Sequence, residues 1–147
     1  MAFRDTKTQK ALPIAATPVL LTGTLAQVGA VVPLAGLTRA TLWGSYARHA
    51  SSSSGTPKVA LFLSPDPPGD VAPTHWFPLY AADLTTLAAG ALAAYPLTVT
   101  LGATVTGTRA VMWPGAIDVA GAHWLYVAAA DADGTNCGTL ALSLTGD

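Results

Sequence analysis

The sequence predicts an all-β protein: an antiparallel β-sandwich or jelly roll with an extended N-terminal arm and at most one short helix. Three observations lead to this fold class. Short segments alternate apolar and polar residues with a period of two, the pattern of a half-buried strand. The 147 residues include 14 glycines and 11 prolines, which separate these segments with turns. No helical period repeats along the chain, so the segments are expected to pack as sheets.

Residues 1–18 are predicted to form the arm, and residues 19–147 the sandwich domain. The arm has no clear period and contains two prolines. Such a segment is ordered only when something holds it, so we expect a partner or a neighbouring subunit to bind it. Its basic residues, which are the candidates for that contact, are Arg4, Lys7 and Lys10.

The first half of the domain is expected to contain four strands, at residues 19–25, 27–34, 38–47 and 58–64. In the third strand, Ala40, Leu42 and Tyr46 point to one face and Trp43 to the other. The fourth strand alternates in the same way. Four consecutive serines lie between the two strands. We therefore predict that the third and fourth strands form a long hairpin with these serines at its tip.

The middle of the chain carries weaker signals. Residues 65–73 contain four prolines and cannot be a central strand, so we expect a loop there. A short aromatic segment follows at residues 75–80. In residues 81–94, Asp83 can cap a helix whose leucines lie roughly on one face, but Gly90 weakens it. A short helix and an alanine-rich loop are both compatible with this segment.

The last third is again predicted to be β-structure. Its expected strands are residues 97–101, 104–113, 123–130 and 139–145. The last of these is the most regular in the chain, with Leu140, Leu142 and Leu144 facing inward. Residues 131–138 are expected to form a turn, most simply the turn of a hairpin.

The chain has few charged residues. They make up 10% of the chain and include no glutamate, whereas soluble domains use about a quarter. This composition suggests that other subunits cover much of the surface, although a GC-rich genome could produce part of the same bias. The formal net charge of −1 gives no electrostatic basis for binding nucleic acid or an anionic membrane. The best candidate for a membrane span, residues 28–37, is too short and contains Pro33.

The sequence contains no pattern that indicates catalysis, a metal site or a cofactor. The single cysteine, Cys137, excludes an intrachain disulfide. The three histidines are isolated from one another, and no Gly-x-Ser-x-Gly motif is present. Residues 131–136 resemble the start of a calcium loop, but the glutamate that ends such a loop is missing, and we favour a turn. We expect a protein that is not an enzyme.

The aromatic residues are the remaining candidates for binding. Trp124 and Tyr126 share one strand face, opposite Leu125 and Val127. Exposed aromatic side chains serve protein interfaces and also stack on sugars. Burial in the core or a subunit interface is the simpler interpretation, and a glycan-binding platform is the alternative. The aromatic residues proposed to bind a partner are Trp43, Trp76, Trp124 and Tyr126.

Three stretches give the sequence a family resemblance. Residues 34–43 read Leu-x-x-Leu-Thr-Arg-Ala-Thr-Leu-Trp, and residues 62–66 read Phe-Leu-Ser-Pro-Asp. The third stretch, His-Trp-Phe-Pro-Leu-Tyr, occupies residues 75–80, and a related Gly-Ala-His-Trp-Leu-Tyr-Val occupies residues 121–127. In this order they resemble small β-sandwich structural proteins of tailed bacteriophages. The proline-rich loop is longer than that pattern leads us to expect.

The resemblance implies a location in the virion, most simply on the capsid surface. It implies a decoration or cement protein that binds major capsid subunits, often as a dimer or trimer. A tail or neck component is the alternative within the virion, and a carbohydrate-binding or receptor-binding module is the alternative outside this class. In the decoration model, the basic residues of the arm would meet acidic patches on the capsid, and many copies would strengthen a small contact area.

Overall fold

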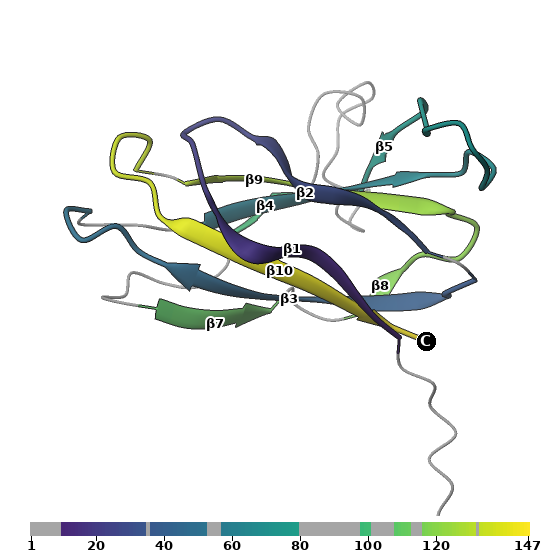
Figure 1. The fold of residues 1–147 in the computed structure, drawn as a ribbon, viewed down its shortest axis with the longest axis horizontal. Helices are drawn as coiled ribbons and strands as arrows, with labels where there is room; N and C mark the ends of the chain where they lie inside the picture. Colours follow the sequence, from purple (N-terminus) through teal and green to yellow (C-terminus); the bar gives the residue numbers. More distant parts are fainter. Residues whose placement is uncertain are drawn as a thin grey trace, which may run out of the picture.

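The computed structural model describes residues 10–34, 36–52, 57–79, 98–100, 108–112, 116–131 and 133–147. These residues form two antiparallel sheets that pack face to face around one apolar core (Figure 1). They contain strands and turns but no helix. The predicted all-β sandwich is therefore confirmed. The segment at residues 81–94, for which a short helix was considered, lies outside the described residues.

Within the described residues each sheet has five strands. Sheet A has the order β1 (Lys10–Leu20), β10 (Thr139–Gly146), β3 (Arg39–Ala47) and β7 (Thr108–Met112), with β8 (Ile117–Asp118) also paired to β3. Sheet B has the order β2 (Ala26–Pro33), β9 (Trp124–Asp131), β4 (Pro57–Ser64) and β5 (Phe77–Pro78), with β6 (Thr98–Thr100) also paired to β4.

The pairings between strands are nested. β1 pairs with β10, β2 with β9, β3 with β8 and β7, and β4 with β6 and β5, so that each later strand of the first half meets an earlier part of the second half. Successive pairs lie alternately in the two sheets: the pairs of β1 and β3 are in sheet A, and the pairs of β2 and β4 are in sheet B. This is the topology of a long hairpin rolled into two sheets, which is a jelly roll. Of the two architectures that the sequence allowed, the structure has this more specific one.

The predicted hairpin between the third and fourth strands is wrong. β3 lies in sheet A and β4 in sheet B, so the connection between them crosses from one sheet to the other. Leu42 and Tyr46 of β3 and Val59 and Leu61 of β4 are all buried in the same core. Alternation fixes which face of a strand is apolar. It does not distinguish a neighbour in the same sheet from a strand across the core, and this explains the error.

The predicted hairpin turn after β9 is wrong for the same reason. β9 belongs to sheet B and β10 to sheet A, so residues 132–138 connect the two sheets and do not close a hairpin. The inward leucines of β10 are confirmed, since Leu140 and Leu144 are completely buried and Leu142 is 2% exposed.

The predicted boundary between arm and domain, at residue 18, lies within β1. From Lys10 to Leu20 the chain is an edge strand of sheet A paired with β10, and Ile14 and Ala15 belong to the core. An edge strand tolerates Pro13 and Pro18 because only one side of it needs hydrogen-bond donors. The pairing shifts register twice in this region. Residues 1–9 lie outside the described residues.

One buried carboxylate connects the two sheets. Asp131 is 1% exposed at the end of β9, and its Oδ2 accepts hydrogen bonds from Tyr46 Oη at 2.7 Å and from the Gly138 N–H at 2.8 Å. Its Oδ1 accepts from the Asp133 N–H at 3.1 Å, and its own N–H donates to the Thr22 carbonyl at 2.8 Å. Burial, and then the hydrogen bond to this carboxylate, raise the pKa of Tyr46 well above its ordinary value.

The replacement Tyr46→Phe should lower the free energy of unfolding at neutral pH by about 1.5–3 kcal/mol, because a buried carboxylate loses one of its donors. The pH dependence gives a second readout. A folded-state pKa above the unfolded value means that the phenol stabilises the fold below about pH 10 and that this stabilisation is lost as the pH rises toward the folded-state pKa. Urea unfolding should therefore show a smaller alkaline loss of stability in the variant. An equal alkaline loss in both proteins would contradict this assignment.

The contact between β1 and β2 depends on Gly29, which has a φ of 74° where the β2–β9 register shifts. A Cβ at this position would lie 2.0 Å from the Ile14 carbonyl oxygen. We expect Gly29→Ala to cost more than about 3 kcal/mol in the free energy of unfolding. Gly36→Ala is the matched control, since Gly36 has a φ of 83° but no neighbour within 4 Å, and it should cost only about 1–2 kcal/mol. Thermal and urea unfolding measure the stability of both variants. Equal losses of stability would argue against the close contact between Gly29 and the Ile14 carbonyl.

Candidate interaction surfaces

On the outer face of sheet A, the described outward positions of β1, of β10 and of β3 from Thr41 to Ala47 are uncharged, and a charged side chain, Arg39, stands at the start of β3. Opposed residues such as Trp43 and Ser143, or Ser45 and Ala141, form rows across this face. Its members, called the sheet A outer face below, are Pro13, Leu20, Thr41, Trp43, Ser45, Ala47, Thr139, Ala141, Ser143 and Thr145. Two features of this face, the scarcity of charged residues and the exposed tryptophan, are typical of the centres of protein interfaces.

Trp43 is the most prominent side chain of this face. It is 44% exposed, and its indole Nε1 donates a hydrogen bond to Thr145 Oγ1 at 2.7 Å, which fixes the orientation of the ring. A shallow hollow of about 230 Å³ lies beside the ring and is bounded by Ala16, Ser45 and Ser143, among others. Leu20, on β1, is 67% exposed at the edge of the same sheet. The face therefore combines a fixed aromatic side chain with an adjacent concavity.

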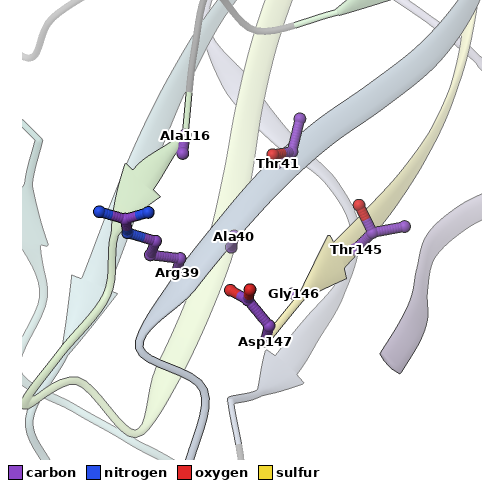
Figure 2. A pocket seen from close by; sticks show the side chains of 7 residues that line it. All are labelled: Arg39, Ala40, Thr41, Ala116, Thr145, Gly146 and Asp147. Carbon is purple, nitrogen blue, oxygen red and sulfur yellow. The ribbon is translucent and has the colours of Figure 1, made fainter. Parts of the chain in front are cut away.

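A second, smaller hollow lies at the end of sheet A (Figure 2). It measures about 190 Å³, and Figure 2 shows the Arg39 guanidinium, the Asp147 carboxylate and the Thr41 and Thr145 hydroxyls around it. Backbone hydrogen bonds join Arg39 and Asp147, with N–H to carbonyl distances of 3.2 and 3.1 Å. Within the described residues this site has no histidine, no thiol and no second carboxylate, so its side chains do not compose a catalytic pair.

The outer face of sheet B carries a cluster of aromatic rings from β4, β9 and the segment before β5. The Phe62 and Tyr126 rings stack with centroids 4.6 Å apart, and Trp76 meets Tyr126 edge to face at 4.7 Å. Burial raises the pKa of Tyr126. The Trp124 indole Nε1 donates to the Asp66 carbonyl at 3.0 Å. Each of these rings is held by a neighbour, so the cluster is rigid.

A groove of about 460 Å³ opens beside this cluster, between β2 and the proline-rich loop. Trp76 and Trp124 line it together with two polar and several aliphatic residues. These lining residues include Gln27, Val31, Asp70 and Val71. Val71 is 79% exposed, and Asp70 has no hydrogen-bond or ion-pair partner within the described part of the chain.

Asp66 holds the two ends of the proline-rich loop together. Its Oδ2 accepts hydrogen bonds from the Thr74 N–H at 2.7 Å and the His75 N–H at 3.0 Å, and its Oδ1 lies 2.9 Å from His75 Nδ1. The two backbone donors, that of His75 first, and then the His75 side chain lower the pKa of Asp66. The loop that forms one wall of the groove is therefore closed at its base, as in a compact Ω-loop.

The structure divides the predicted binding residues between two faces. Trp43 lies on sheet A, whereas Trp76, Trp124 and Tyr126 lie together on sheet B. Of the basic residues of the predicted arm, Lys10 begins β1, and Arg4 and Lys7 lie outside the described residues. Tyr126 contributes through ring contacts within the cluster.

The calcium-like segment uses its carboxylates internally. Asp133 Oδ2 accepts from Ser52 Oγ at 2.6 Å, and its Oδ1 accepts from the Asn136 N–H at 2.9 Å. These donors, the Ser52 hydroxyl first, lower the pKa of Asp133. Together with the bonds of Asp131, they account for the segment as a turn fixed by its own hydrogen bonds.

The described residues show no arrangement for metal binding or for a reactive thiol. No group of three or more histidine, cysteine, aspartate or glutamate side chains converges there on a point where a metal ion could bind. Cys137 is buried, and burial raises the pKa of its thiol, which opposes nucleophilic reactivity. None of the described residues belongs to a helix long and apolar enough to cross a membrane.

Comparison with known proteins identifies no family. No protein-family model matches the chain, and no curated protein sequence matches it. A chain in the structure of infectious bursal disease virus Gx strain is similar, with a TM-score of 0.39 and 10% sequence identity. The match covers 95% of this chain and 33% of that chain, so this chain spans about a third of its length. This similarity is too low to indicate a shared function.

Sequence reasoning missed most of the groove. Gln27 and Val31 come from β2, and Asp70 and Val71 from a loop about forty residues later, so no local motif joins them. Asp66 carried a usable signal, because an aspartate that begins a proline-rich loop often caps backbone N–H groups within it. That signal would have predicted the loop closure but not the groove.

The replacement Asp66→Ala should open the base of the proline-rich loop while the sandwich stays folded. We expect faster hydrogen exchange of the Thr74 and His75 amides, because both lose their acceptor. Asp70→Ala is the control within the same loop and should leave both amides unchanged. In the wild-type protein a lowered pKa means that the closure is present above about pH 4 and is lost as the pH falls through the folded-state pKa. Unchanged exchange in Asp66→Ala would refute the role of this carboxylate.

Proposed function

We propose that this chain is a non-enzymatic structural protein of a virion, which decorates or cements the capsid of a tailed bacteriophage by binding major capsid subunits. The observation that carries the proposal is the sheet A outer face. A sheet face that meets only water normally carries charged side chains throughout, whereas the region around the exposed Trp43 presents Thr, Ser and Ala, and Arg39 stands at the end of the sheet. The low charge of the whole chain supports the same conclusion.

The edge strand β1 supports a clamp-like attachment. Its outward residues continue the sheet A outer face, and Lys10 at its start connects this face to the basic segment with Arg4 and Lys7. In this proposal the three basic residues contact acidic patches on the capsid, and Trp43 is inserted at the centre of the contact. A self-associated dimer or trimer would place several such contacts on the lattice at once.

A tail or neck component is the second location that fits the same surface. The two locations differ in copy number. Quantitative mass spectrometry of purified particles should give this chain at the abundance of the major capsid protein or at a simple fraction of it. A few dozen copies or fewer would place it in the tail or neck. Absence from the particles would overturn the virion proposal.

The replacement Trp43→Asp should weaken binding to assembled major capsid protein at least about tenfold, because it puts a charge into the centre of an apolar contact. Co-sedimentation of the recombinant protein with capsids measures the effect. Trp124→Ala, on the opposite sheet, is the matched control and should bind as the wild type does. Circular dichroism and thermal unfolding verify that both variants are folded. Equal binding by Trp43→Asp and wild type would remove the sheet A outer face from the proposal.

A further inference from the structure

We propose that the groove between β2 and the proline-rich loop is a binding site for a neutral oligosaccharide. This function is separate from capsid attachment, because the groove lies on sheet B and the proposed capsid contact on sheet A. Its volume of about 460 Å³ is within the range of small-ligand sites, roughly 300–1,000 Å³.

The lining matches the two kinds of surface that a sugar ring presents. A pyranose ring has an apolar face of C–H groups and a rim of hydroxyl groups. Trp76 and Trp124, with Val31 and Val71, supply apolar and aromatic surface for the first. Asp70 and Gln27 supply polar atoms for the second.

The polar groups are acceptors that remain available. Gln27 Nε2 donates to the Gly29 carbonyl at 3.1 Å, which leaves the amide oxygen free to accept a hydrogen bond. Asp70 has no partner within the described residues. Both can accept from sugar hydroxyl groups, as polar groups do in sites that fix the orientation of a ligand.

The charge of the groove selects among sugars. Among the described residues that line it there is no lysine, arginine or histidine, and Asp70 is the one ionisable group. An acidic sugar would meet a carboxylate without a compensating cation, so a neutral glycan is favoured. A cationic ligand would also satisfy Asp70 and the two indole faces, so the test below includes a quaternary ammonium ion to separate it from a neutral sugar.

The walls are preorganised, which reduces the entropy lost on binding. The Trp124 indole is fixed by the Asp66 carbonyl, and Trp76 is fixed by its edge-to-face contact with Tyr126. The side chain of Asp66 closes the loop that carries Asp70 and Val71. Asp66 thus orients the Trp124 indole through its backbone carbonyl and fixes the opposite wall of the groove, the proline-rich loop, through its carboxylate.

The test is a screen of the full-length protein on an array of neutral and acidic oligosaccharides, followed by calorimetric titration of the neutral sugars that bind. We expect at least one neutral oligosaccharide to bind, and Trp76→Ala and Trp124→Ala each to weaken it at least about tenfold. Trp43→Ala on sheet A is the aromatic control and should bind with unchanged affinity. If Trp124→Ala unfolds, Asp70→Ala is the second variant: this exposed residue has no described partner, and its removal should weaken binding several-fold without a change in stability.

Several results would overturn the proposal. One is that no neutral sugar on the array binds. Another is that Trp76→Ala and Asp70→Ala bind as the wild type does. A third is saturation of the groove by tetramethylammonium but by no sugar, which would identify a cation site. Failure of the capsid experiment has no bearing on these outcomes, because sugar binding and co-sedimentation depend on different tryptophans.

Discussion

The buried carboxylate of Asp131 is the interaction on which the arrangement of the two sheets depends. Taking a carboxylate out of water is costly unless several donors satisfy it, and here a phenol and two backbone N–H groups do so. These donors belong to β3 and to both ends of the turn before β10, whereas the aspartate itself ends β9. The charge is therefore satisfied only when sheet A, sheet B and the connecting turn have the correct relative positions.

The same strand alternation that builds the core gives the two outer faces different chemical character. On sheet A the outward positions carry small uncharged residues around Trp43, a surface suited to another protein. On sheet B they carry stacked rings beside a groove, a surface suited to a small ligand. The thin sandwich keeps these surfaces back to back, so a molecule held to a lattice by one face would present the other outward.

Strand periodicity was sufficient to predict the fold class and the inward residues, but not which strands are neighbours. The leucines of β10 were identified from alternation alone, because a period-two pattern depends only on the strand itself. The placement of β3 and β4 in different sheets depends on the whole topology, and Pro13 and Pro18 concealed an edge strand. Asp131 looked like an exposed turn residue, since its burial arises from Tyr46, 85 positions away in the sequence. The groove is similarly assembled from distant segments.

The nested pairing has a consequence for how the chain folds. Lys10 is opposite Gly146, so the outermost pair joins residues that are 136 positions apart (146 minus 10), whereas the innermost described pair joins β4 to β5. Closing such long loops lowers the folding rate, because chain entropy is lost before the contacts compensate for it. We therefore expect β1 to dock late in folding. Until it does, β10 exposes an unpaired edge, and during this interval the chain is most prone to pair with another copy of itself.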